Sequence, residues 1–199
     1  MKRATLMLAA VALLLGCAER AKASLVITFA QSGPDVTATG AGSLNFSDLS
    51  FSAFDMASSY VDPSVGAVLL GSSGAYADYY GSISGPTAFG TGLLVGANSS
   101  TSTAPGATGA GVDGATGRLL VPGGYVEDAP FTVSATWDDT TISGLGLTPG
   151  TYMWTWGTGS GSDFLEVDIP GTVPEPSSVI PLLSMLLAIA FVARKRIAA

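Results

Sequence analysis

Alternation of apolar and polar side chains at every second position constrains this sequence more than any other feature. It begins in 25–29 and 36–46 and returns in three later runs, 131–137, 152–156 and 165–169. A period of two places successive side chains on opposite faces of an extended strand, whereas a helix needs a period of about 3.6. Short alternating runs with Gly- and Pro-rich connections, and no amphipathic helix between them, are typical of antiparallel sheets. The sequence therefore predicts an all-β fold, either an antiparallel β-sandwich or a jelly roll.

Residues 1–23 predict a secretory signal peptide that precedes this domain. Lys2 and Arg3 are followed by an apolar stretch, and small residues occupy Ala21 and Ala23. A short basic region, an apolar core and an A-x-A pair together mark a signal peptidase site. We therefore expect cleavage after Ala23 and a domain that begins at Ser24.

The N-terminal processing site has one open alternative. The segment Leu14-Leu15-Gly16-Cys17 resembles a bacterial lipobox, in which Cys17 would be lipidated and become the first residue. The Ala23 site is favoured because its pair of small residues is complete and the alternating pattern starts directly after it. Both routes predict a chain that leaves the cytoplasm.

An uncharged apolar run near the C-terminus predicts a single transmembrane helix. The 17 residues of 177–193 contain no charge. As a helix they would span about 26 Å, which is close to the thickness of a hydrocarbon core of about 30 Å. Arg194, Lys195 and Arg196 follow at once, and clustered basic residues beside a membrane segment stay in the cytoplasm. The sequence thus predicts an exported body with a C-terminal anchor that stops at 194–196.

The tail 173–199 resembles the PEP-CTERM sorting signal of Gram-negative bacteria. The resemblance lies in Pro174-Glu175-Pro176, the apolar segment 179–193 and the basic stop, in that order. It implies that an exosortase, a membrane-embedded transpeptidase-like cysteine protease, recognises Pro174, Glu175 and Pro176. It also implies transient anchoring in the inner membrane, followed by release to the cell surface or an exopolysaccharide and biofilm matrix. The two prolines keep the motif extended and outside the predicted helix, where an enzyme can bind it. The preceding domain resembles uncharacterised exported domains, which imply no activity.

The predicted exported domain, 24–172, is strongly acidic. It holds 13 of the 15 acidic residues and one of the 8 basic residues, Arg118, which gives a formal charge of −12 (1 − 13). A surface of this charge repels nucleic acid and anionic membranes, so we exclude both as partners of the domain. The excess of acidic residues also keeps an exported domain soluble.

The absence of two residue types excludes most catalytic chemistry. The chain has no His, and its one Cys is Cys17. Disulfides, His-dependent triads, Cys nucleophiles and the usual zinc, copper and iron ligand sets are therefore excluded from the domain. Only chemistry that depends on oxygen-bearing side chains remains. We expect no cofactor and no enzymatic activity.

The segment 96–117 differs from the alternating runs. Apart from Val112 and Asp113 it contains only Gly, Ala, Ser, Thr, Pro, Asn. Such a composition buries little apolar surface, so the sequence predicts a long flexible loop here.

Three aromatic side chains share one face of the predicted strand 152–156. Tyr152, Trp154 and Trp156 would fill the core if they point inward. If they point outward, they would form a platform that stacks on sugar rings. The core interpretation is favoured, and sugar contact through these three residues remains the alternative.

Three acidic residues near the end of the domain form the best candidate for a cation site. Asp163, Glu166 and Asp168 are close in the sequence, but Glu166 and Asp168 lie opposite the apolar positions of their strand. The sequence favours a solvated face, with a weak calcium site as the alternative. We expect no metal.

Together with what the tail resemblance implies, these features predict an exported, non-catalytic protein of the cell surface or extracellular matrix. Its role would be structural, or an interaction with exopolysaccharide. One alternative is a carbohydrate-binding module that uses the aromatic strand 152–156. Another is a glycoside hydrolase that depends on carboxylates alone.

Overall fold

The computed structural model describes residues 24–104, 106 and 108–171. The chain divides into two units, 1–169 and 170–199, and the strands of the described residues belong to the first. The predicted signal peptide (1–23) and the whole of the predicted sorting tail (173–199) lie outside the described residues. Within those residues, no helix has the length and apolar character needed to cross a membrane.

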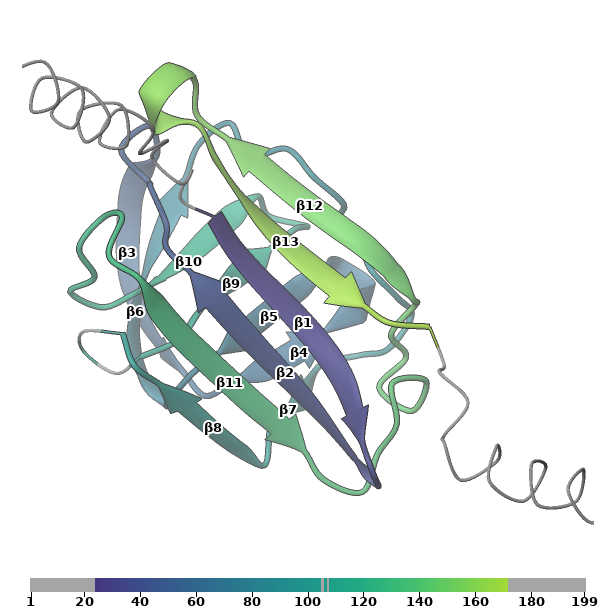
Figure 1. Ribbon diagram of the computed structural model, residues 1–199. Coiled ribbons are helices and arrows are strands. Elements are labelled where there is room, and N and C mark those ends of the chain that lie inside the picture. Colours follow the sequence, from purple (N-terminus) through teal and green to yellow (C-terminus); the bar gives the residue numbers. More distant parts are fainter. Residues whose placement is uncertain (1–23, 105, 107, 172–199) are drawn as a thin grey trace, which may run out of the picture. The chain divides into compact units, whose positions relative to one another are not determined.

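The described residues of the first unit form two β-sheets, so the all-β prediction is confirmed for them (Figure 1). The six-stranded sheet has the order β12 (Gly150–Trp156), β13 (Asp163–Ile169), β1 (Ser24–Ser32), β2 (Asp35–Gly42), β11 (Phe131–Trp137), β8 (Ser99–Ser102). Only β1 and β13 run parallel in this sheet, and the other neighbours are antiparallel. Five of these strands coincide with the alternating runs of the sequence.

The second sheet has seven strands, all of them antiparallel to their neighbours. Their order is β3 (Ser50–Ala57), β6 (Gly74–Tyr80), β10 (Arg118–Pro122), β9 (Ala110–Asp113), β5 (Ala67–Leu70), β4 (Tyr60–Asp62), β7 (Val95–Gly96). Two short 3-10 helices, Pro63–Val65 and Gly159–Gly161, are the other elements of the residues that the structure describes.

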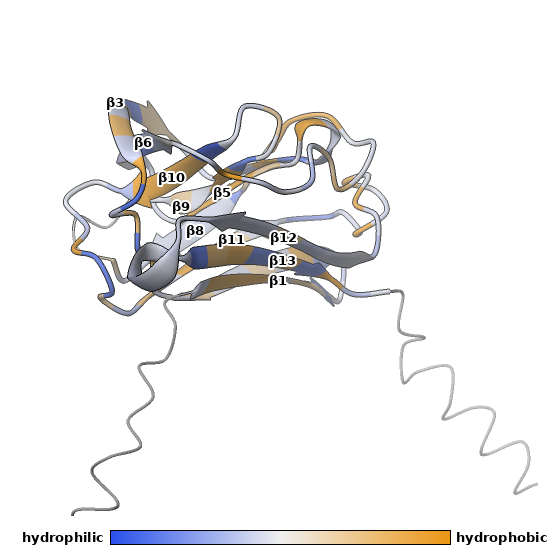
Figure 2. Cartoon of the chain, turned by 90° about the horizontal axis from the view of Figure 1, so that it is seen from above, coloured by the Kyte–Doolittle hydropathy of each residue, from blue (hydrophilic) through white to orange (hydrophobic). Residues whose placement is uncertain are grey.

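The two sheets lie as layers over a shared apolar core (Figure 2). Leu25, Ile27 and Phe29 of β1 are completely buried. Residues of the second sheet, such as Val68 and Leu119, belong to the same cluster. Burying one apolar face of each sheet removes large areas of side chain from water, which is the main stabilising term for such a domain.

The prediction of a flexible loop over 96–117 is wrong in part, because strands run through that segment. It contains β8 and β9, and Val112 of β9 is completely buried. The small residues permit close backbone pairing instead of preventing order. A Cβ added at Gly111 would lie 1.8 Å from the carbonyl oxygen of Val68 on β5, so only glycine fits there.

Candidate functional site

The aromatic strand 152–156 faces the core and not the solvent. Trp154 is 1% exposed and Trp156 is 3% exposed. Their indole N–H groups donate to the carbonyl oxygens of Pro86 at 2.9 Å and Asn45 at 2.7 Å. The interpretation of this strand as a sugar-stacking platform is therefore wrong, because a buried ring offers no face to a sugar.

Tyr152, the third member of that group, is half-buried at the margin of the core. Its ring lies 5.8 Å from the ring of Phe89, measured between centroids. Its hydroxyl donates to the carbonyl oxygen of Thr148 at 3.0 Å. Tyr152 thus packs against the edge of the core.

The three acidic residues of the weak calcium candidate do not come together. Asp163 is 4% exposed and lies on the inner face of β13, whereas Glu166 and Asp168 lie on the outer face. Odd spacings along a strand place side chains on opposite faces. In the part of the chain that the structure describes, no three acidic side chains are placed to hold a metal ion.

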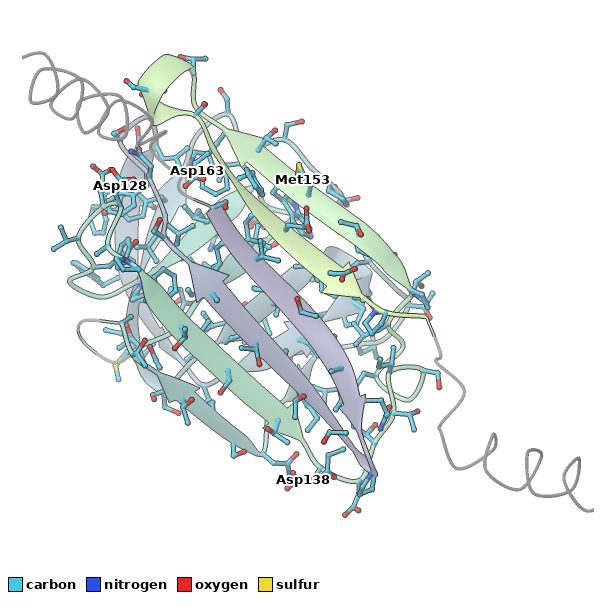
Figure 3. All side chains as sticks on the ribbon, viewed as in Figure 1. Asp128, Asp138, Met153 and Asp163 are labelled. Atoms are coloured by element: carbon cyan, nitrogen blue, oxygen red, sulfur yellow. The ribbon has the colours of Figure 1, made fainter. Side chains whose placement is uncertain are left out.

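A pocket of about 320 Å³ that is open to solvent, called the hairpin cavity below, lies beside the hairpin that joins β12 to β13. Figure 3 shows Asp163 at this end of the six-stranded sheet. The cavity brings together Trp156 and Asp163, which the sequence placed in two separate groups. Its walls are formed by Ser82, Ser84, Thr155, Trp156, Gly157, Ser162, Asp163, Phe164.

Backbone contacts fix the walls of this hairpin cavity. Ser84 and Thr155 exchange two backbone hydrogen bonds, of 2.9 and 2.8 Å, so the segment around Ser84 is held against the edge of β12. On the other side, the carboxylate of Asp48 accepts a hydrogen bond from the Thr158 amide at 2.8 Å. Gly157 has a φ of +71°, a conformation that glycine adopts without strain and that turns the chain out of β12.

Asp163 is the only ionisable residue in the wall of the cavity. Its carboxylate accepts hydrogen bonds from the backbone amides of Asn45 and Phe164, both at 2.7 Å. Burial raises the pKa of Asp163 to about 6, although these two hydrogen bonds oppose the shift. The group is thus held rigidly and is partly protonated in mildly acidic solution.

The raised pKa of Asp163 predicts a pH dependence of stability. Its ordinary value is 3.8, so between about pH 4 and 6 the folded domain binds the proton more tightly than the unfolded chain. The free energy of unfolding should fall as the pH rises through that range, by at most about 3 kcal/mol from this group. Denaturation curves of the wild type and of Asp163→Asn should therefore differ in slope against pH. Asp168→Asn, an outward-facing control on the same strand, should keep the wild-type slope. Equal slopes for the wild type and Asp163→Asn would refute the assignment.

The chemistry of the cavity suits a neutral ligand that carries hydroxyl groups. Ser82, Ser84 and Thr155 are exposed and contribute hydroxyls that can donate and accept. Phe164, which is partly exposed, contributes aromatic surface next to the carboxylate of Asp163, whereas the ring of Trp156 is buried behind the wall. A few polar groups on a partly apolar wall are typical of small-molecule sites. Sequence reasoning missed both serines, because only the fold brings them to this edge.

No protein-family model, no curated protein and no solved structure matches this chain. Its function is therefore inferred from its own residues and their geometry.

Proposed function

We propose that this protein is an exported, non-catalytic component of the cell surface or extracellular matrix whose β domain binds a saccharide. The observation that supports this function is the hairpin cavity, with its hydroxyl groups, its single carboxylate and its aromatic wall. The ligand would be one sugar unit, at a chain end or a branch of an exopolysaccharide.

The size and polarity of the cavity agree with a single sugar unit. Its volume of about 320 Å³ is at the lower end of the range of small-molecule pockets, which is about 300–1,000 Å³. A sugar hydroxyl can donate to the Asp163 carboxylate and exchange hydrogen bonds with Thr155 and Ser84. The less polar face of a sugar ring packs well on aromatic side chains such as Phe164.

The charge of the domain narrows the class of saccharide. With 13 acidic residues and one basic residue in 24–172, the domain repels polymers rich in uronate, sulfate or phosphate. The cavity wall contains no basic side chain that would offset this repulsion. Neutral or amine-bearing saccharides are therefore the proposed ligands.

Binding fits the cavity better than hydrolysis does. Glycoside hydrolases usually employ two carboxyl groups, one as acid and one as base or nucleophile. The cavity wall contributes one carboxylate, that of Asp163, and both of its oxygens accept backbone hydrogen bonds. The carboxylate-dependent glycoside hydrolase thus has less support than the binding function.

Delivery of the domain is part of the same proposal. The predicted signal peptide would export the chain, and the tail 173–199 would hold it in the inner membrane. An exosortase would then act at Pro174-Glu175-Pro176 and release the domain to the surface or matrix. These segments lie outside the described residues, and the proposal for them depends on the sequence alone.

Filling the hairpin cavity tests the proposed function. Ser162→Phe places a ring in the cavity wall, whereas Ser160→Phe adds the same ring at an exposed position of the same hairpin. Calorimetric titration of the full chain with neutral gluco-, manno- and galacto-oligosaccharides should detect binding to the wild type and to Ser160→Phe. Affinity should fall at least about tenfold in Ser162→Phe, which corresponds to a loss of about 1.4 kcal/mol. Unchanged affinity in Ser162→Phe would show that the cavity is not the binding site.

A further inference from the structure

The strand β3 forms one edge of the seven-stranded sheet and pairs with β6 alone. In the part of the chain that the structure describes, no strand pairs with its other side. Soluble proteins usually protect a long edge strand with charged side chains, proline or a covering segment, because its free N–H and C=O groups can pair with another chain. β3 has eight residues, seven of them exposed, and Asp55 is its only charge. Its edge is therefore open to a further strand.

The large apolar side chains of β3 point to the core side of the sheet but are not covered. Phe51 lies opposite Tyr79 of β6, which packs against the main core. Phe54 lies opposite Ala77, which is buried, and Met56 shares the face of Phe54 because it follows two residues later. Nevertheless, the exposed fractions of Phe51, Phe54 and Met56 are 51%, 67% and 76%. Figure 2 shows β3 at the margin of its layer, with apolar residues along it.

These three residues, called the β3 patch below, are joined to the core by a row of aromatic rings. The ring centroids of Phe51 and Phe54 are 5.0 Å apart, and those of Phe51 and Tyr79 are 5.9 Å apart. The ring of Tyr79 lies 4.5 Å from that of Phe46, which packs against the core. Tilted and edge-on ring pairs at such distances attract each other, so the patch is held in a defined arrangement. Exposed apolar side chains gathered in this way are typical of an interaction surface.

A second copy of β3 fits this edge in the antiparallel direction. A two-fold axis perpendicular to the sheet would bring the two β3 patches together on the same side. The pairing of β3 with β6 is irregular between Phe51 and Ala53 and regular from Ala53 to Ala57, so the axis belongs in the regular stretch. With the axis at Phe54, the two Phe54 side chains become direct neighbours, and each Asp55 lies opposite Ala53 of the other copy. With the axis at Asp55, two like charges would lie directly opposite each other, which is destabilising.

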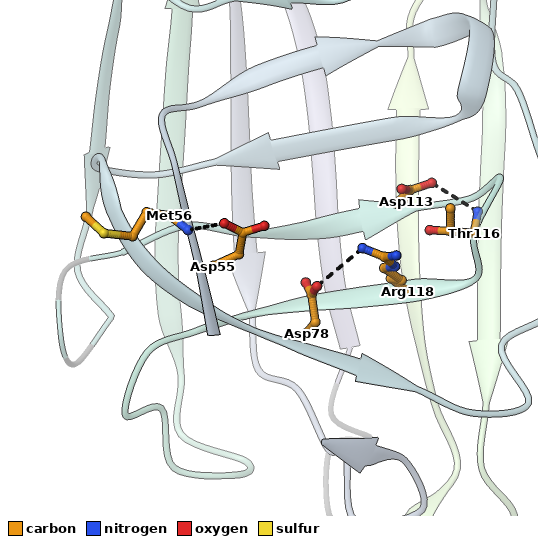
Figure 4. A network of polar contacts seen from close by, with 6 residues as sticks. All are labelled: Asp55, Met56, Asp78, Asp113, Thr116 and Arg118. Carbon is orange, nitrogen blue, oxygen red and sulfur yellow. Dashed lines mark hydrogen bonds and ion pairs between the residues drawn. The ribbon is translucent and has the colours of Figure 1, made fainter. Parts of the chain in front are cut away.

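Charge opposes this pairing only weakly. The domain 24–172 has a formal charge of −12 (1 − 13), so two copies repel each other. Close to β3, however, Asp78 forms an ion pair with Arg118, with 3.4 Å between Oδ2 and Nη1, and the Asp55 carboxylate accepts a hydrogen bond from the Met56 amide at 2.7 Å (Figure 4). Charges further apart than about 8 Å are largely screened at physiological ionic strength. A cationic strand would gain little at this edge, because Asp55 is the only charge on β3.

The exposed area of the β3 patch fits a weak dimer. A large aromatic side chain buries about 150–250 Å², so at these exposed fractions the patch would remove roughly 300–500 Å² per copy from water. The strand backbone and the smaller side chains of both copies add to this area. The total approaches the lower limit of stable interfaces, which is about 1,200 Å². Dimerisation is therefore expected in the micromolar range.

We propose that two copies of this protein pair through β3, antiparallel about a two-fold axis at Phe54, to form one continuous sheet. The two β3 patches cover each other on the core side of that sheet, and each open edge is closed by the other. This pairing goes beyond the proposed function and does not depend on it, since no residue of β3 lies in the wall of the hairpin cavity.

Sedimentation velocity of the full chain over a concentration series tests the dimer. The wild type should pass from monomer to dimer within the micromolar range, and at a lower concentration when salt is raised, because salt screens the repulsion. Phe54→Lys should weaken dimerisation at least about tenfold, since it places two cations opposite each other at the axis. It also reduces the net negative charge, so general repulsion would not explain a weaker dimer. Met153→Lys adds the same charge at an exposed position of β12 (Figure 3) and should dimerise like the wild type.

Disulfide trapping tests the position of the axis. Cys17 is the only Cys of the chain, so single cysteines are introduced in a Cys17→Ser background. Directly opposite residues of an antiparallel pair have Cα atoms about 4.5–5.5 Å apart, which a disulfide can span, so Phe54→Cys should form a covalent dimer under mild oxidation. With the axis at Phe54, the two Asp55 Cα atoms would be about 8 Å apart, which is too far for a disulfide. Asp55→Cys should therefore react at least about tenfold more slowly.

Three results would overturn the proposal. The first is a wild type that stays monomeric at every concentration and salt level, whether or not its edge binds a peptide of alternating lysine and valine instead. The second is a dimer that Phe54→Lys leaves unchanged, which would place the interface elsewhere. The third is equal trapping of Phe54→Cys and Asp55→Cys, which would rule out a two-fold axis at Phe54. Far-UV circular dichroism checks that each variant folds, as expected for substitutions at exposed positions of β3.

Discussion

Replacing Trp154 with alanine is expected to lower the free energy of unfolding by about 3–5 kcal/mol, the usual cost of removing a large aromatic side chain from a core. The ring is 1% exposed and makes an edge-on contact with Phe89, with 6.3 Å between ring centroids. Gly85 also packs against it, so closely that an added Cβ would lie 2.4 Å from the indole. The substitution would leave a cavity and the Pro86 carbonyl oxygen without its donor.

Met153→Ala is the control for this substitution, because Met153 is the neighbouring residue on β12 and is 43% exposed. It should change the free energy of unfolding by no more than about 1 kcal/mol. Denaturant titration followed by far-UV circular dichroism measures both values. A Trp154→Ala variant with wild-type stability would contradict the assignment of Trp154 to the core. It would also restore the hypothesis that this strand stacks on sugar rings.

Replacing both Pro174 and Pro176 with alanine is expected to abolish maturation. Export and membrane insertion would depend on the predicted signal peptide and the predicted membrane segment, so they should continue. Processing should stop, because the two prolines are expected to keep the proposed motif extended and separate from the predicted helix that follows. Alanine favours the helical conformation and would let the helix extend through Glu175.

The mass of the mature protein shows the outcome in cells that contain an exosortase. The wild type should lose the residues beyond the motif, and the double variant should keep them in the membrane fraction. Ser177→Ala and Ser178→Ala together give a control in which the motif is intact. Equal loss of the tail from the wild type and the proline variant would mean that the motif is only a linker.

The main strands of the six-stranded sheet could be predicted because their inner faces carry large apolar side chains. Leu165, Val167 and Ile169 of β13 alternate with polar residues, and the structure buries all three. The seven-stranded sheet was harder to predict, since several of its strands are short or lack alternation. In β5 every residue is buried, including Leu69 on the outer face, so no period of two is visible there.

The strands within 96–117 were missed for a related reason. Small residues contribute little hydrophobic surface, and the usual inference from such a composition is a disordered loop. Here Gly111 is required for close pairing between β9 and β5, so the segment is ordered by its pairing with β5 and β10. Tertiary context of this kind is not encoded in local composition.

In the candidate sites, too, single residues could be recognised from the sequence, whereas the contacts between distant segments could not. Trp156 and Asp163 were recognisable as notable residues, but their shared cavity depends on Ser82 and Ser84, which are distant in the sequence. That Arg118 is the only basic residue within 24–172 was visible from composition. Its ion pair with Asp78 depends on the pairing of β10 with β6, which no local pattern predicts.

Mapping the saccharide site by hydrogen–deuterium exchange tests the central claim most directly. The full chain is compared with and without the tightest-binding neutral oligosaccharide. Saturating ligand should slow exchange in the peptides that cover 82–84 and 155–164, the two segments that form the hairpin cavity, and the protection should be absent in Ser162→Phe. Protection confined to other segments, or protection that persists in Ser162→Phe, would contradict the proposal that this cavity holds the sugar.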